Sequence, residues 1–97
     1  MPTYITLYKW TDQGIKNVKS APARIDASIN AAQAMGGKLH GVYVTVGEYD
    51  LAAISEWPND ESAAAMVLAQ ASQGNVKTTT MKAFTTAEFA EIVKKMP

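Results

Sequence analysis

The sequence of 97 residues predicts an α+β domain built on a four-stranded antiparallel sheet with helices on one face. Two observations lead to this fold class. Strand-like and helix-like segments follow one another in the order β-α-β-β-α-β-α, and a segment with turn chemistry at residues 47–50 separates the two middle strands. Hydrophobic residues make up 47% of the chain and charged residues 19%, which predicts a packed core. We therefore expect residues 1–97 to form one domain.

Residues 3–10 alternate as a β-strand does. Tyr4, Thr6, Tyr8 and Trp10 point to one side, and the residues between them point to the other. The segment 11–14 that follows has the composition of a loop.

The first helix is predicted to begin near Ser20, because Pro22 is tolerated in the first turn of a helix. Ile25 and Ile29 recur at helical spacing, and the glycine pair 36–37 is expected to end the helix through a left-handed cap.

Two strands, at residues 39–46 and 50–57, are predicted to form a hairpin around Gly47, Tyr49 and Asp50. Their apolar runs are rich in β-branched, aromatic or small side chains, and the glycine and aspartate between them are typical of a turn.

The second half of the chain repeats the helix–strand order. Residues 58–60 offer an N-cap for a second helix, and residues 76–84 form a threonine-rich fourth strand. Thr85 and Glu88 fit a capping box at the start of a short final helix. This order is that of the ferredoxin-like fold, βαββαβ with an added helix, and it places the first and third strands in the centre of the sheet.

One face of such a sheet has no helices to cover it, and large apolar side chains occur on both faces. Either a second copy packs against the open face, or a long loop or the final helix folds over it. We predict a homodimer or higher homo-oligomer, because leaving these side chains in water costs on the order of 10 kcal/mol. The interface is expected to contain Tyr4, Tyr8, Tyr43 or Trp57.

His40 is the single histidine and the one candidate for a catalytic base. A three-residue turn at 47–49 would pair Val42 with Ile54 and His40 with Glu56, whose carboxylate could orient the imidazole. A two-residue turn would set His40 against Ser55 instead. The alternative to a base is a surface pair at the end of the hairpin.

Asp50 also has two interpretations. It could contact a ligand at the mouth of a cavity, or its carboxylate could accept hydrogen bonds from backbone N–H groups at the turn. Tyr49 could donate a hydrogen bond to a ligand or cover the turn.

Several classes of function are not expected. The chain has no cysteine, no phosphate-binding glycine motif and no metal-ligand spacing, so we expect neither a cofactor nor a metal. Nine basic and nine acidic residues are scattered along it, which argues against nucleic acid as a partner. No apolar run is long enough to span a membrane, and no secretion signal is recognisable, so we expect a cytoplasmic protein.

Several segments of the sequence resemble the GYD domain family. They are residues 2–7, the run Trp10-Thr11-Asp12-Gln13-Gly14-Ile15, residues 36–39, Gly47-Glu48-Tyr49-Asp50 and residues 74–85. The resemblance implies a ferredoxin-like fold of the dimeric α/β barrel group. It implies no catalytic residues, since the biochemical role of the family is uncharacterised.

The sequence thus predicts a homo-oligomer that binds a small apolar or aromatic metabolite in a pocket lined by Tyr4, Tyr8, Tyr43 and Trp57. One alternative is a cofactor-free enzyme of the monooxygenase or isomerase type with His40 as base. The other is a structural or interaction protein without a pocket.

Overall fold

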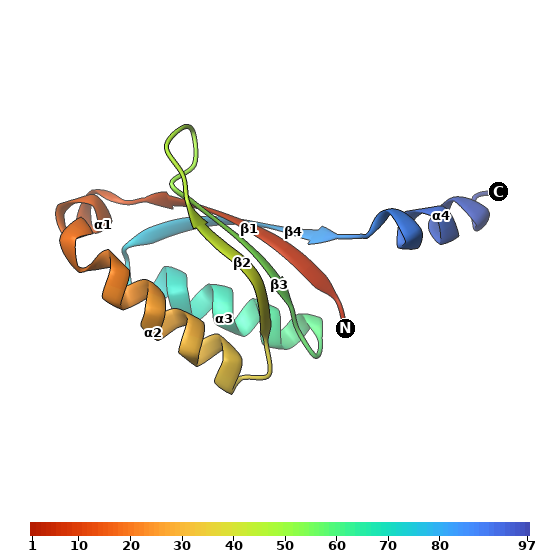
Figure 1. The fold of residues 1–97 in the computed structure, drawn as a ribbon, viewed down its shortest axis with the longest axis horizontal. Coiled ribbons are helices and arrows are strands. Elements are labelled where there is room, and N and C mark those ends of the chain that lie inside the picture. Colours follow the sequence, from red (N-terminus) through yellow and green to blue (C-terminus); the bar gives the residue numbers. More distant parts are fainter.

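A four-stranded antiparallel sheet with two helices on one face forms the body of the protein, seen here in a computed structural model that describes residues 1–97 (Figure 1). The strands are β1 (Thr3–Trp10), β2 (Lys38–Val44), β3 (Leu51–Glu56) and β4 (Val76–Ala83). The helices are α1 (Asp12–Lys16), the 3₁₀ turn η1 (Val18–Ser20), α2 (Ala21–Ala34), α3 (Asp60–Ser72) and α4 (Thr86–Lys94). This is the predicted α+β ferredoxin-like arrangement.

The strand order is β2-β3-β1-β4, so β1 and β3 lie in the centre as predicted. Helices α2 and α3 both lie below the sheet in Figure 1. Helix α2 connects the central strand β1 to the edge strand β2, and α3 connects the central strand β3 to the edge strand β4. Both connections cross the same face of the sheet, so the opposite face has no helix.

The alternation of β1 decides which side chains meet the helices. Tyr4, Thr6 and Tyr8 pair with Ser55, Ala53 and Leu51 of β3, and all six side chains are buried or half-buried on the helical face. The opposite, open face therefore carries the other parity, which includes Ile5, Leu7 and Ile54.

Of the two registers considered for the hairpin, the one with a three-residue turn is wrong. Next to the turn the strands have the other register, with Val42 paired with Ala53, although the connection 45–50 is longer than two residues. The register shifts between Leu39 and Gly41, where His40 forms a β-bulge, so that Leu39 and not His40 pairs with Ser55. The bulge puts Leu39 and Val42 on the same face, which simple alternation would not do.

Most of the predicted helix signals are confirmed. Gly36 ends α2 with a φ of 88°, the side chain of Asn59 accepts a hydrogen bond from Ser62 N at 2.8 Å, and Thr85 and Glu88 form both halves of a capping box. The exception is α1, which sequence analysis predicts to be a loop. Its five residues are too few to show helical periodicity.

The buried core is small and lies near one end of the helical face. Its cluster contains Tyr4, Ala32, Trp57, Ala63 and Met66. Since Ala32 is near the end of α2 and Ala63 near the start of α3, the two helices run in opposite directions past the sheet. Their other ends, around Arg24 and Gln70, lie away from the core cluster.

Helix α4 projects from the body and buries none of its residues (Figure 1). It does not fold back over the sheet, and no loop does so, which leaves the open face uncovered within the chain. Tyr43 on this face is 62% exposed and Ile54 39%. The molecule measures 50 × 30 × 19 Å, and the projecting helix accounts for its elongation.

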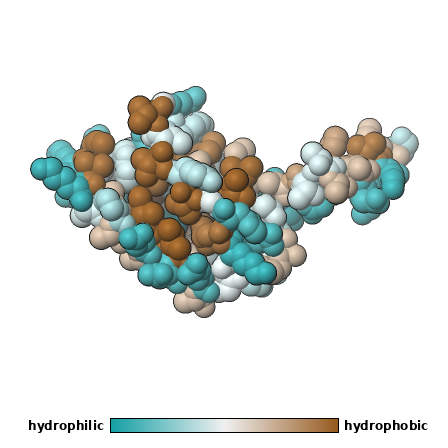
Figure 2. Space-filling model, in the orientation of Figure 1, coloured by the Kyte–Doolittle hydropathy of each residue, from teal (hydrophilic) through white to brown (hydrophobic).

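Apart from the open face of the sheet, hydrophobic side chains gather in two places on the surface (Figure 2). One group runs from the loop between β2 and β3 down towards the gap between β2 and α2. Val44 at the end of β2 and Val46 in this loop are both exposed. The second group lies on α4.

Candidate functional site

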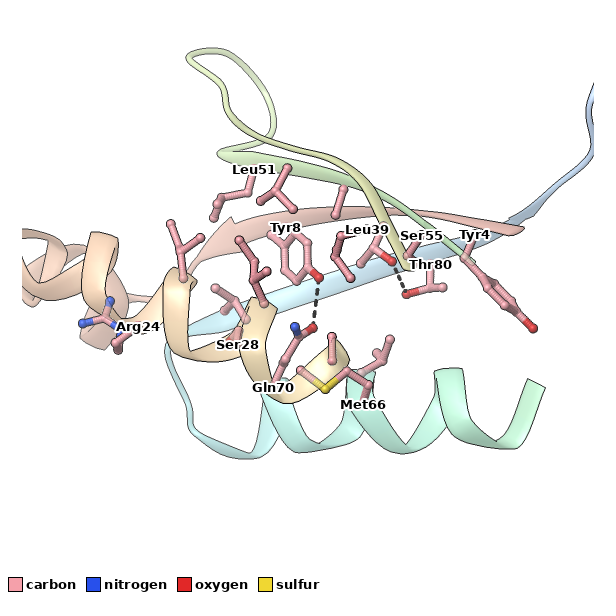
Figure 3. A pocket seen from close by; sticks show the side chains of 18 of the residues that line it. Tyr4, Tyr8, Arg24, Ser28, Leu39, Leu51, Ser55, Met66, Gln70 and Thr80 are labelled. Atoms are coloured by element: carbon pink, nitrogen blue, oxygen red, sulfur yellow. Dashed lines mark hydrogen bonds between the residues drawn. The ribbon is translucent and has the colours of Figure 1, made fainter. Parts of the chain in front are cut away.

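A cavity of about 110 Å³ lies between the helical face of the sheet and helices α2 and α3 (Figure 3). Four aromatic residues line it: Tyr4, Tyr8, Trp10 and Trp57. Aliphatic side chains from β2, β3, β4 and both helices complete most of its wall. The cavity is therefore largely apolar, as ligand sites commonly are, although it is smaller than most.

Small residues explain why the helices leave this space. Thr6, Ala53 and Ser55 occupy the helical face of the two central strands, and Ala32 and Ala63 face them from α2 and α3. Larger aliphatic side chains at these positions would fill the gap, because protein interiors pack densely wherever side-chain volume allows.

Several polar side chains on the wall are hydrogen-bonded to one another. The Tyr8 hydroxyl donates to Gln70 Oε1 at 2.9 Å, and Trp57 Nε1 donates to Ser55 Oγ at 3.0 Å. Burial raises the pKa of the Tyr8 phenol above its ordinary value. Tyr8 is therefore a neutral donor at physiological pH, and its bond holds the Gln70 amide against the cavity.

Tyr4 crosses the core end of the cavity and points its hydroxyl away from it. The hydroxyl donates to Oδ1 of Asp60, at the first residue of α3 (Figure 3 shows the ring directed outwards). Burial, reinforced by the Asp60 carboxylate, raises the pKa of Tyr4 to about 12. The same hydrogen bond holds the pKa of the exposed Asp60 carboxyl below its usual range. Tyr4 thus ties β1 to α3.

The four aromatic residues grouped by sequence analysis are divided between two faces. Tyr4, Tyr8 and Trp57 line the cavity. Tyr43 pairs with Ala52 on the open face and is not among the lining residues. Tyr4 and Trp57 are also buried beneath the helices, so of the four residues predicted at a sheet interface, Tyr43 alone lies on the open face.

His40 also lies outside the cavity. Its Nε2 is 2.7 Å from Oε1 of Glu56, although the two residues are not paired in the ladder. The bulge swings the imidazole onto Glu56, whose backbone partner is Lys38. Both side chains are substantially exposed, at 47% and 31%, so the geometry is that of a surface pair at the end of the hairpin.

Asp50 acts on the backbone of a neighbouring strand. Its Oδ2 accepts a hydrogen bond from Trp10 N at 2.8 Å, and its own N–H donates to the Tyr8 carbonyl at 2.8 Å. Asp50 therefore joins the hairpin to the end of β1, which extends the structural interpretation beyond the turn itself. The ring of Tyr49 lies 5.1 Å from the ammonium of Lys9, and Gly47 stands in open space.

Sequence analysis missed a second connection, which we call the turn clamp: residues 11–14 after β1 together with residues 74–75 before β4. Thr11 N donates to the Asn75 carbonyl at 3.0 Å, and Thr11 Oγ1 donates to the Gly74 carbonyl at 2.6 Å. Gly14 lies so close that a Cβ there would overlap the Asn75 carbonyl oxygen. The clamp closes the end of the cavity that Trp10 and Asn75 line.

Sequence analysis also missed Arg24 of α2, which lines the cavity at the end away from the core cluster. It is the single arginine of the chain and stands next to Ile25 of the helical stripe. That position on a predicted amphipathic helix is the signal that could have revealed it.

No group of three or more His, Cys, Asp or Glu side chains is placed to hold a metal ion. None of the helices has both the length and the apolar character needed to cross a bilayer.

The sheet, its two covering helices and the cavity define a ferredoxin-like α+β protein. The profile of the GYD domain family matches residues 4–93, and the chain belongs to this family. It is also similar to a protein of Thermus thermophilus named "Glutamine synthetase and cystathionine beta-lyase binding protein". The two are 30% identical over 95 residues, which cover 97% of this chain and 100% of the relative. No solved structure shows a significant match.

Proposed function

We propose that the chain is a homo-oligomeric protein-binding module, in which α4 docks on another protein and the open face of the sheet joins two copies. The observation that carries this proposal is the apolar stripe of α4, which has no partner in the chain. The Thermus relative, named for binding two enzymes, supports a role in protein interaction.

Helix α4 has the pattern of a docking helix. Phe89, Ile92, Val93 and Met96 follow the spacing i, i+3, i+4, i+7 along one side, and all are exposed. A helix of nine residues is marginal in water without a partner. An amphipathic helix gains stability by laying this side into an apolar groove of another protein.

The open face suits self-association. The four-stranded face spans about 500 Å², which is more than half of the about 800 Å² that each partner usually contributes to a stable interface. The loop between β2 and β3 adds further exposed apolar side chains, including Val46.

The docking proposal is tested with purified glutamine synthetase and cystathionine β-lyase from the organism that supplies the chain. We expect either enzyme to bind the immobilised protein in biolayer interferometry, and Phe89→Asp to weaken that binding at least 10-fold. The matched control is Glu91→Ala, which alters the polar side of α4 and should leave binding unchanged.

If neither enzyme bound, the name of the Thermus relative would no longer support the docking proposal. If Phe89→Asp instead dissociated the homo-oligomer, α4 would belong to the self-association interface and the docking proposal would be wrong.

Self-association is tested by light scattering coupled to size-exclusion chromatography at micromolar concentration. We expect a dimer or larger species, and we expect Ile54→Lys to shift it to monomer. Ile54 is exposed in the isolated chain, so the charge should leave its fold intact. Leu68→Lys on the outer side of α3 is the control, since Leu68 is equally apolar and 70% exposed. A wild-type monomer would contradict this part of the proposal.

A second candidate function is the binding of a small apolar or aromatic molecule, and the cavity beside α2 and α3 favours it. We propose binding without catalysis, because His40 lies outside this cavity. A ligand should raise the thermal unfolding midpoint equally in wild type and in His40→Ala. Ala53→Leu, which adds volume inside the cavity, should abolish the effect.

A further inference from the structure

No charged group points into the cavity. Arg24 is the one charged residue among those lining it, and no aspartate or glutamate contributes to the wall. The guanidinium of Arg24 is turned away, because Nη1 donates to the Asn17 carbonyl at 3.0 Å and to the Ser20 hydroxyl. Its Nη2 is buried where no ligand reaches it. A charged ligand would leave water here without an ionic partner, which is costly, so the cavity selects for an uncharged molecule.

Gln70 of α3 has hydrogen-bonding capacity left over on the cavity wall. Its Oε1 accepts from the Tyr8 hydroxyl at 2.9 Å, which directs the amide from α3 towards the sheet (Figure 3). Its Nε2 has no acceptor within the protein. This nitrogen is accessible, since the one buried side-chain nitrogen or oxygen without a partner is Arg24 Nη2. Gln70 therefore presents two N–H donors to a molecule in the cavity.

Most of the other polar side chains on the wall already have partners there. Trp57 Nε1 donates to Ser55 Oγ at 3.0 Å, and the hydroxyl oxygens of Thr6 and Thr80 lie 3.4 Å apart. Ser28 of α2 adds a hydroxyl to the wall, which makes it the rival to Gln70 as a contact for a ligand. An amide N–H donates and cannot accept, so Gln70 Nε2 is specific for an acceptor such as a carbonyl oxygen.

We propose that the cavity binds a small uncharged carbonyl compound, with its carbonyl oxygen on Gln70 Nε2 and its apolar body among neighbouring aliphatic side chains. Leu51 pairs with Tyr8 in the ladder, Val67 lies one turn before Gln70 on α3, and both line the cavity. An apolar cavity of about 150 Å³ accommodates the six carbons of benzene, so this one, at about 110 Å³, suits about five non-hydrogen atoms. This inference rests on the second candidate function, small-molecule binding by the cavity.

The test uses three probes of nearly the same shape: butanone, 2-methylbut-1-ene and propanoate. The alkene has a methylene group in place of the carbonyl oxygen, and propanoate has a charged oxygen in place of a methyl group. Dissociation constants come from NMR titration of ¹⁵N-labelled protein, which follows the backbone amides of the lining residues and the side-chain amide of Gln70. We expect butanone to shift the Gln70 side-chain signals, and propanoate to bind at least 10-fold more weakly than butanone.

Variants of Gln70 test its role as the donor. Gln70→Met keeps the length of the side chain and removes both N–H groups, and Gln70→Glu removes them while keeping an acceptor for Tyr8. In both, the affinity for butanone relative to the alkene should fall about 3-fold to 10-fold, the usual effect of one neutral hydrogen bond. The alkene serves as the reference because it reports any change in packing that the substitution causes.

Two further variants serve as controls. Gln73→Met removes another glutamine amide from the lining of the same cavity, and Ser28→Ala removes the rival hydroxyl. Both should keep the wild-type ratio of the butanone and alkene affinities.

The outcomes separate the two levels of the proposal. If propanoate binds as tightly as butanone, or if the Gln70 variants keep the wild-type ratio, the carbonyl inference is wrong while small-molecule binding stands. A fall of the ratio in Ser28→Ala alone would assign the contact to Ser28 and overturn the inference as well. If none of the three probes shifts a signal of the lining residues, both the inference and the second candidate function are overturned.

Discussion

The turn clamp and helix α4 differ in where their stabilising contacts come from. The clamp joins segments about sixty residues apart, through Thr11, Gln13 and Gly14 on one side and Gly74 and Asn75 on the other. Helix α4 has contacts within itself, a complete capping box and a Glu91–Lys94 pair, and buries nothing against the body.

The difference shows that a segment with a clear helical pattern can still lack the tertiary contacts that would stabilise it. The clamp has almost no periodic pattern, yet its polar groups are satisfied by distant partners. Helix α4 has the clearest amphipathic pattern of the chain, yet its apolar side remains exposed. A helix obtains most of its stability from packing that side, so α4 needs a surface that the chain does not supply.

The largest expected effect is on the clamp. Gly14→Ala would drive a methyl group into the Asn75 carbonyl oxygen, so the two turns would have to separate. We expect the free energy of unfolding in urea to fall by about 3 kcal/mol or more. Gly47→Ala is the control, because a methyl group there would meet no atom within 4 Å, and it should change stability by less than about 0.5 kcal/mol. Equal effects of the two substitutions would show that the clamp is not rigid.

A smaller effect is expected where the hairpin joins β1. Asp50→Ala leaves the backbone N–H of Trp10 without its carboxylate acceptor, which should lower the free energy of unfolding by about 1–3 kcal/mol. Glu48→Ala in the same loop removes an exposed carboxylate with no such role. Urea unfolding of both variants measures the difference, and a neutral Asp50→Ala would argue for a ligand-contacting role instead.

The alkaline pH dependence tests the link between β1 and α3. The pKa of Tyr4 is raised from 10.0 to about 12, so the folded state holds this proton more tightly than the unfolded chain does. Its contribution to stability is fully present below about pH 10 and is lost as the pH rises towards 12. Tyr4→Phe should reduce this alkaline loss of stability in urea titrations. An unchanged slope would mean that Tyr4 is not protected in the folded state.

The smallest effect on global stability is expected at α4. Thr85→Ala removes the cap of the helix, a loss of about 1 kcal/mol for the helix itself. Because α4 buries no residue, the unfolding midpoint of the isolated body should not move, while the amide protons of α4 should exchange faster. A drop in the midpoint would show that α4 is packed in solution, on a second copy or on the body.

Much of the fold follows from local signals. The alternation in β1, the glycine pair after α2, and the caps at Asn59 and Thr85 predict the elements and their order, because each signal acts within a few residues. Element order and the handedness of crossover connections then place β1 and β3 in the centre.

Contacts between distant segments account for what the sequence left open. The bulge at His40 changed the register and separated Tyr43 from the other three aromatic residues, since one inserted residue reverses the faces of a strand. Arg24 Nη2 has no hydrogen-bond partner, and the apolar side of α4 has no packing partner. Both facts depend on which groups lie nearby in the folded chain. The sequence specifies which polar and apolar groups each residue carries, but the tertiary structure decides which of these groups find a partner.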